Sequence, residues 1–158
     1  MELVAPKSAV NTKREVVAPV VSDVRAEWDW VKHGVKEILR DQPTLTYRPE
    51  DVYASCIAGE SHLITVEKSK FVVLKISTDE FSLERTMYLW LCWVAPEIRT
   101  GENIKEYIEY FRKLAVSENC KYLETGTTTK ALGRLYTSIG MEVTSSTYRL
   151  EIGNNNNV

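Results

Sequence analysis

Apolar and polar side chains change their spacing several times along the chain, and the longest strand-like stretch lies in its middle. Arg85–Val94 is rich in aromatic and β-branched residues and contains neither Gly nor Pro. This composition predicts a central strand that is buried on both faces. After Pro96 and Gly101, apolar residues recur at helical spacing from Asn103 onward. The middle of the chain therefore predicts a strand, a loop and a helix.

A second strand and a second helix follow this first pair. Lys121–Thr125 has the length and composition of a short strand, and a right-handed crossover would place it parallel to the central strand. Apolar residues then recur at helical spacing from Leu132 to Ile139. Gly140 comes directly after them, at the usual position of a helix-ending glycine.

The part of the chain before the central strand predicts an edge strand, two helices and two more strands. Ser22 or Asp23 can cap the first helix, within which Gly34 is weakly destabilising. Pro49 stands at the start of the second helix, where its fixed backbone angle is favourable. The predicted elements are an edge strand at Glu15–Val21, a helix over residues 24–39, a short helix at Pro49–Ile57, and strands at Leu63–Glu67 and Phe71–Thr78.

The two ends of the chain complete the predicted organisation. Residues 1–14 have no periodicity and are expected to form a flexible arm, and residues 153–158 form a polar tail. Glu142–Thr144 and Thr147–Ile152 are predicted as the last two strands. Residues 15–152 are therefore expected to form a single α+β domain. Its mixed central sheet would hold six to seven strands, an antiparallel meander plus one parallel crossover, with helices on both faces.

Composition restricts the classes of function. A net charge of −2 and a pI near 5.8 argue against a nucleic-acid partner, which requires a concentrated basic face. The chain has no apolar stretch long enough to cross a membrane, so a cytoplasmic protein is expected. Three separated cysteines predict reduced thiols packed in the core. His33 and His62 fall on different elements, and no metal site is predicted from them.

The candidate chemistry lies in the loop after the central strand. Backbone N–H groups at the start of a helix have no intrahelical acceptor and carry partial positive charge. The helix start after Gly101 is therefore suited to a phosphate or pyrophosphate. A nucleotide-bearing cofactor is the ligand that this pattern favours.

At this point the residues resemble a known family, the GNAT acyltransferases, which are acetyl-CoA-dependent N-acetyltransferases, and in particular the small GNAT-like proteins of tailed bacteriophages. The resemblance is carried by two segments, Val94–Gly101, reading VAPEIRTG, and Ala131–Met141, reading ALGRLYTSIGM. It covers the chain from about residue 15 to residue 152 in element order. It implies transfer of an acetyl group from acetyl-CoA to an amine of unknown identity, without a metal.

The resemblance also implies roles for individual residues. Tyr136 would protonate the departing CoA thiolate, although packing beside its helical neighbours would equally explain a tyrosine there. A carboxylate would accept the proton of the attacking amine; Glu124 is the candidate, and Glu84 and Glu97 are the other acids available. Cofactor binding is implied for the end of the central strand and the loop after it, at Val94, Arg99, Thr100, Gly101, Glu102 and Asn103.

The loop departs from the family's pattern at two positions. Glu102 and Ile104 fall where the family has small residues that allow the backbone to approach the pyrophosphate, and Glu102 would place a carboxylate beside a phosphate. Either the loop is one residue shorter and Gly101 alone serves it, or cofactor binding is weak or lost. A second hypothesis therefore remains open, a non-catalytic GNAT-fold phage protein that acts in virion assembly or host interaction through a phage or host protein partner.

Overall fold

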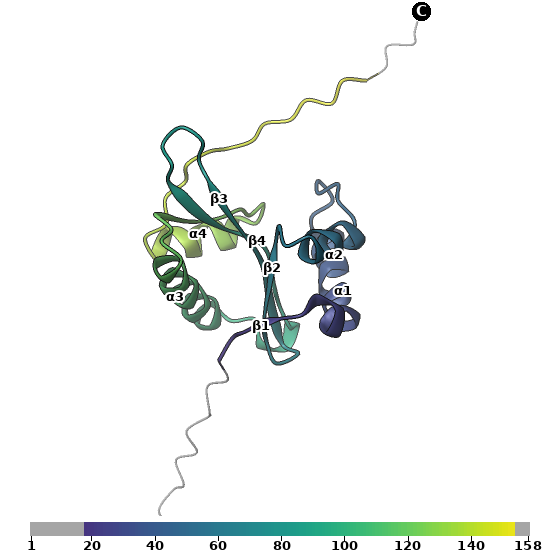
Figure 1. Ribbon diagram of the computed structural model, residues 1–158. Coiled ribbons are helices and arrows are strands. Elements are labelled where there is room, and N and C mark those ends of the chain that lie inside the picture. The colour runs from purple at the N-terminus through teal and green to yellow at the C-terminus, as the bar shows by residue number, and fades with distance from the viewer. Residues whose placement is uncertain (1–17, 154–158) are drawn as a thin grey trace, which may run out of the picture. The chain divides into compact units, whose positions relative to one another are not determined.

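The computed structural model describes residues 18–153 and has the predicted α+β class (Figure 1). The predicted arm at residues 1–14, the beginning of the predicted first strand and most of the polar tail lie outside the described residues. The elements are β1 (Val20–Ser22), α1 (Val24–Asp41), α2 (Pro49–Ile57), β2 (His62–Val66), β3 (Lys70–Thr78), β4 (Arg85–Val94), a 3-10 turn η1 (Pro96–Ile98), α3 (Gly101–Ser117), β5 (Tyr122–Thr125) and α4 (Lys130–Ser138).

The strands form one mixed sheet in the order β1-β2-β3-β4-β5. The β1–β2 and β2–β3 pairs are antiparallel, whereas β5 runs parallel to β4 after the α3 crossover. The meander and the parallel crossover are thus confirmed. The described sheet has five strands, fewer than the predicted six to seven.

The two missing strands are Glu142–Thr144 and Thr147–Ile152, which have no regular secondary structure and are exposed along their whole length. Their alternating pattern indicates that the segment can pair as a strand. Pairing also requires a neighbouring backbone, which an alternating pattern does not supply. The prediction of two terminal strands within this chain was therefore wrong.

The chain divides into two compact units, and the first comprises residues 18–75 and 90–96 of the described chain. Asp23 caps α1, as predicted, because its Oδ1 accepts a hydrogen bond from Arg25 N at 2.9 Å. Gly34 lies against two rings: a Cβ built there would be 2.4 Å from Phe71 and 2.9 Å from Trp93. Phe71 and Trp93 are themselves stacked, with centroids 5.6 Å apart. The core of this unit therefore requires a residue without a side chain at position 34.

The second unit comprises residues 76–89 and 97–153 of the described chain. Its core lies under α3, which buries Tyr107, Phe111 and Ala115. The start of the parallel ladder is fixed by a hydrogen bond from Lys121 N to Arg85 O at 2.8 Å and by the Lys121–Glu84 ion pair. α4 has no buried residue, so the last helix is only partly packed.

Burial of β4 differs from the prediction. Met87, Leu89, Leu91 and Trp93 are buried, but the residues between them are half-buried or exposed. The expectation that both faces would be buried was wrong because only one alternating set of β4 side chains is packed into the core. Cys92 belongs to the other set and is exposed, and Cys56 and Cys120 are only half-buried. The prediction of three core cysteines is corrected accordingly.

Candidate cofactor-binding site

The parallel ladder between β4 and β5 is short and ends abruptly. It consists of four pairs, from Thr86 with Tyr122 to Leu89 with Thr125. The Thr125 hydroxyl donates to Leu89 O at 3.2 Å and closes the ladder. β4 continues to Val94, whereas β5 has ended. In the described part of the chain, the last five residues of β4 therefore have no pairing to β5.

A tyrosine hydroxyl lies where this ladder ends. Tyr88 is the register partner of Glu124, and a Cβ built at Gly126 would be 3.4 Å from the Tyr88 hydroxyl oxygen. The Tyr88 hydroxyl thus lies beside the first residue after β5. Tyr88 is not among the site residues predicted from the sequence. The sequence signal that could have identified it is a tyrosine, with its hydroxyl, in the part of β4 that was expected to pair with the parallel strand.

The loop before α3 is held by its own side chains. The Thr100 Oγ1 caps the helix by accepting from Asn103 N at 3.2 Å. The Asn103 side-chain amide donates to Ile98 O at 2.7 Å and ties the first turn of α3 to η1. Asn103 is therefore engaged through its side chain within the loop, and the groups that remain for a ligand are backbone amides.

Those amides belong to the first two residues of α3. The N–H groups of Gly101 and Glu102 have no hydrogen-bond acceptor among residues 18–153, as expected at positions N1 and N2 of a helix. A Cβ built at Gly101 would meet nothing within 4 Å, so the space over this helix start is open. The Glu102 side chain is exposed, and its carboxylate competes with any anion for the positive end of the helix.

The other predicted cofactor-binding residues flank this helix start along the chain. Arg99 and Thr100 are exposed in the segment between η1 and α3, and Val94 is the half-buried last residue of β4. Val94 belongs to the first unit, whereas Arg99 and Thr100 belong to the second. The backbone N–H groups at the start of α3 suit an anionic ligand at Gly101. The negative charge of the Glu102 side chain opposes the binding of such a ligand.

The predicted catalytic residues occupy two neighbouring elements of the second unit. Tyr136 is half-buried on α4, and Glu124 is exposed on β5. Glu84 is engaged in the ion pair with Lys121 and, by hydrogen bonding, raises the pKa of that lysine. Glu84 is therefore occupied by the lysine, while Glu97 is exposed on η1. Among the acids considered, Glu124 lies closest along the ladder to its open end.

The threonine-rich segment after β5 is partly used for local structure. The Thr125 hydroxyl closes the ladder, and the Thr127 hydroxyl accepts from Thr129 N at 3.0 Å at the start of α4. These two hydroxyls therefore support the local backbone.

Residues 18–153 contain no group of three His, Cys, Asp or Glu placed to hold a metal ion. His33 instead pairs with Glu37 at 3.2 Å on α1. None of the helices in these residues combines the length and apolarity needed to span a bilayer.

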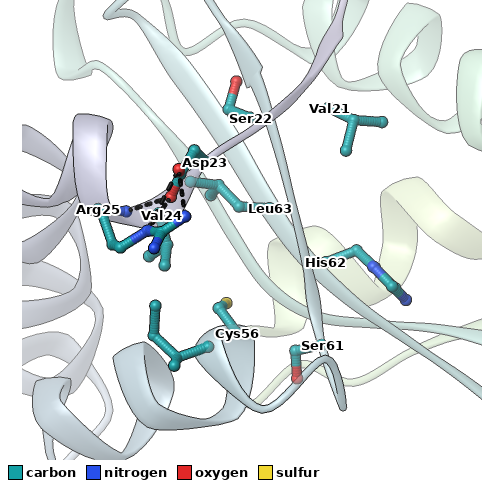
Figure 2. Close-up of a pocket in the computed structure, with 10 residues that line it drawn as sticks. Val21, Ser22, Asp23, Val24, Arg25, Cys56, Ser61, His62 and Leu63 are labelled. Carbon is teal, nitrogen blue, oxygen red and sulfur yellow. Dashed lines mark hydrogen bonds and ion pairs between the residues drawn. The ribbon is translucent and has the colours of Figure 1, made fainter.

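A cavity of about 230 Å³ lies in the first unit, among β1, the start of α1, the end of α2 and the start of β2 (Figure 2). Its charged groups are matched to each other, because Arg25 and Asp23 form an ion pair at 2.9 Å. The His62 side chain points away from Cys56 in Figure 2, so the two do not form a reactive pair. None of the predicted site residues lines this cavity.

Comparisons with known proteins place the fold among acetyltransferases. No family model matches the sequence, and a search of curated proteins gives no match. Among solved structures, ribosomal-protein-alanine N-acetyltransferase from Brucella melitensis biovar Abortus 2308 is similar, with a TM-score of 0.65 and 13% identity, covering 86% of this chain and 100% of that one.

Two other solved structures are similar in fold. Aminoglycoside N-acetyltransferase AAC(6')-Iy in complex with CoA matches with a TM-score of 0.60 and 12% identity, covering 86% of this chain and 99% of that one. The integron cassette protein VCH_CASS6 from the mobile metagenome of V. cholerae matches with a TM-score of 0.62 and 18% identity, covering 88% and 94%. The fold of this chain is thus the mixed α+β fold of GNAT acetyltransferases.

Proposed function

We propose that the protein is an N-acyltransferase that uses acetyl-CoA to acylate an amine. The observation that carries the proposal is the short parallel ladder. β5 ends at Thr125, β4 continues without that partner to Val94, and the next helix begins with two amides that have no acceptor. Similarity in fold to an aminoglycoside acetyltransferase solved with CoA supports acetyl-CoA as the donor.

In this proposal each candidate residue has one task. The amides of Gly101 and Glu102 bind the pyrophosphate, with Arg99 supplying positive charge and Thr100 and Asn103 holding the helix start in place. Val94, the last residue of β4, keeps its assignment as a cofactor contact.

Proton transfer is assigned to two side chains. When bound, acetyl-CoA supplies a thioester whose carbonyl carbon is attacked by the amine nitrogen. Glu124 accepts a proton from that nitrogen, directly or through water, and Tyr136 donates its phenolic proton to the departing sulfur. The new bond is an amide, and the bond broken is the one between carbon and sulfur.

Calorimetric titration with CoA and acetyl-CoA tests donor binding. Glu102→Gln removes the opposing charge and keeps the size of the side chain, so binding should become about 2- to 5-fold tighter. Glu118→Gln is the matched control, because it makes the same change at the C-terminal end of α3, roughly 24 Å away along the axis. Absence of binding to wild-type protein and to both variants at millimolar ligand would refute the proposal.

A thiol-release assay with a panel of primary amines tests the chemistry. Tyr136→Phe should lower kcat and remove the alkaline limb of the pH profile, with little change in CoA affinity. Tyr53→Phe loses the same hydroxyl on α2, where its ring packs against Trp28 at 5.0 Å, and should retain full activity. Equal rates for wild type and Tyr136→Phe would exclude Tyr136 as the acid.

The second candidate function is a non-catalytic GNAT-fold phage protein that acts in virion assembly or host interaction. The observation that favours it is the exposed Glu102 at the helix start where an anionic cofactor would bind. This alternative predicts that CoA binds only after Glu102→Gly and Ile104→Gly are introduced together, and that wild-type protein instead forms a complex with a virion or host protein on a sizing column.

A further inference from the structure

The turn between β3 and β4 carries two exposed apolar side chains. Phe81 is 95% exposed and Leu83 is 74% exposed, although Phe and Leu are among the residues most often fully buried. The Asp79 carboxylate accepts hydrogen bonds from Phe81 N at 2.9 Å and from Ser82 N at 2.7 Å. Leu83 N also donates to Asp79 O at 2.9 Å. This turn, residues 79–83, is called the hairpin tip below, and it presents its apolar side chains from a backbone held by local hydrogen bonds.

The hairpin tip is also acidic. Asp79 and Glu80 come directly before Phe81, and neither carboxylate has a basic partner among residues 18–153. Leu83 has a φ of 58°, in the left-handed region that residues other than glycine seldom adopt. A large apolar side chain therefore stands where glycine would be the less strained choice. The tip combines an exposed aromatic ring with two negative charges.

The cavity of the first unit has the size and the walls to receive such a ring (Figure 2). Its volume is about 230 Å³, whereas an engineered cavity of about 150 Å³ in another protein is large enough to bind benzene. Val21 and Ile57 line it and are 71% and 50% exposed, so the cavity can be reached from the surface. Val24 and Leu63 are buried and form apolar wall further in.

A charged group of this cavity retains hydrogen-bonding capacity. Arg25 donates to the Asp23 carboxylate through Nε and Nη2. A guanidinium has five N–H donors, and Arg25 Nη1 has no acceptor within the described part of the chain. A carboxylate from another molecule can therefore bind Arg25 without displacing Asp23.

We propose that the cavity of the first unit receives the hairpin tip of a second copy of this chain. Phe81 enters among the apolar side chains, and Glu80, its neighbour in sequence, pairs with the outer nitrogens of Arg25. A second copy is the occupant that fits because the chain itself supplies both matching surfaces, an exposed ring beside a carboxylate and an apolar cavity beside a guanidinium. The proposal does not depend on the acyltransferase function.

The tip and the cavity are different surfaces, so the contact between copies is heterologous. Each copy donates one tip and receives another, and the contact either closes into a ring or continues from copy to copy. The contact centres on one aromatic ring and is therefore smaller than the interface of a stable dimer. Association should accordingly be weak and should increase with protein concentration.

Sedimentation equilibrium on the full chain, from micromolar to low millimolar concentration, tests the association. The average mass should rise above the 18.1 kDa of one chain as concentration increases. Phe81→Ala removes the ring and should weaken association about 30-fold or more. Val116→Ala is the matched control, because Val116 is 65% exposed on α3 of the same unit, and it should associate as wild type does. A wild-type chain that stays monomeric throughout, or unchanged association of Phe81→Ala, would overturn the proposal.

Mixing two variants tests which surfaces meet. Ile57→Glu places a negative charge at the cavity and leaves the tip intact, whereas Phe81→Ala leaves the cavity intact. Both residues are at least half exposed, so neither substitution removes a core side chain. Each variant alone should stay monomeric, while the mixture should form a complex, since one intact tip and one intact cavity remain. If both variants keep the wild-type circular dichroism spectrum and the mixture is still monomeric, the tip does not enter the cavity.

Methyl NMR separates a second copy from other occupants. The methyl resonances of Val24 and Leu63 should shift with protein concentration in wild type, and Phe81→Ala should abolish this dependence. If Phe81→Ala instead moves these resonances equally at every concentration, the tip occupies the cavity of its own chain. If the resonances respond to added toluene but not to protein concentration, the cavity accepts free apolar ligands and not a second copy. Either result would overturn the proposal.

Discussion

Replacing Gly34 by alanine should destabilise the protein, although alanine is the better helix former. The substitution gains about 1 kcal/mol of helix propensity. The new methyl group would, however, lie 2.4 Å from Phe71 and 2.9 Å from Trp93, well inside van der Waals contact. Neither ring can move away easily, because both are buried and each is stacked on the other. Overpacking of this kind costs about 3 kcal/mol at the upper end of its range.

The net expectation is a loss of about 2 kcal/mol in the free energy of unfolding, or roughly 4 to 8 °C in Tm for a chain of this length. Urea denaturation followed by tryptophan fluorescence measures the free energy, and circular dichroism measures Tm. Gly133→Ala is the matched control, because Gly133 lies in α4 with nothing within 4 Å of the added methyl group. It should stabilise the protein by up to about 1 kcal/mol. A Gly34→Ala variant as stable as wild type would show that the two rings do not confine this position.

Two further predictions concern the second unit. Phe111 is fully buried under α3, so Phe111→Ala should cost about 3 to 5 kcal/mol of unfolding free energy, whereas Val116→Ala on the exposed side of the same helix should change it by less than about 0.5 kcal/mol. Backbone N–H groups of Ser82 and Phe81 donate to the Asp79 carboxylate and lower its pKa. Its contribution is complete above the unfolded-state pKa, about 3.9, and is lost as pH falls through the lower folded-state value. Stability measured by urea denaturation should therefore decline more steeply below about pH 4 in wild type than in Asp79→Asn.

Local signals predicted the elements whose ends are fixed by local chemistry. The bounds of α2 at Pro49–Ile57 were predicted correctly, because Pro49 at the start and acidic residues in the first turn specify a helix N-terminus. The bounds of β4 were predicted correctly for a similar reason, since an apolar run without Gly or Pro ends at Pro96. Gly140 was predicted to end α4, and its φ of 93° is one that glycine adopts readily.

Features that depend on distant residues were missed. Gly34 was expected only to weaken its helix, since the sequence does not show that Phe71 and Trp93 approach the same point from two other elements. The half-buried face of β4 was missed because an apolar run resembles a fully buried strand when its packing partners are unknown. Thr147–Ile152 was predicted as a strand for the same reason, because an alternating pattern does not show whether a neighbouring strand is present.

The ladder between β4 and β5 is held at its start by the backbone hydrogen bond and the ion pair of Lys121, and at its other end by the single hydroxyl hydrogen bond from Thr125 to Leu89 O. The Lys121 end is therefore the pivot of any separation of the two strands, which should begin at Leu89 and Thr125. Amide hydrogens near the pivot should exchange with solvent most slowly, with faster exchange at each step toward the open end. A ligand that binds at that end would slow exchange there first and leave the pivot unchanged.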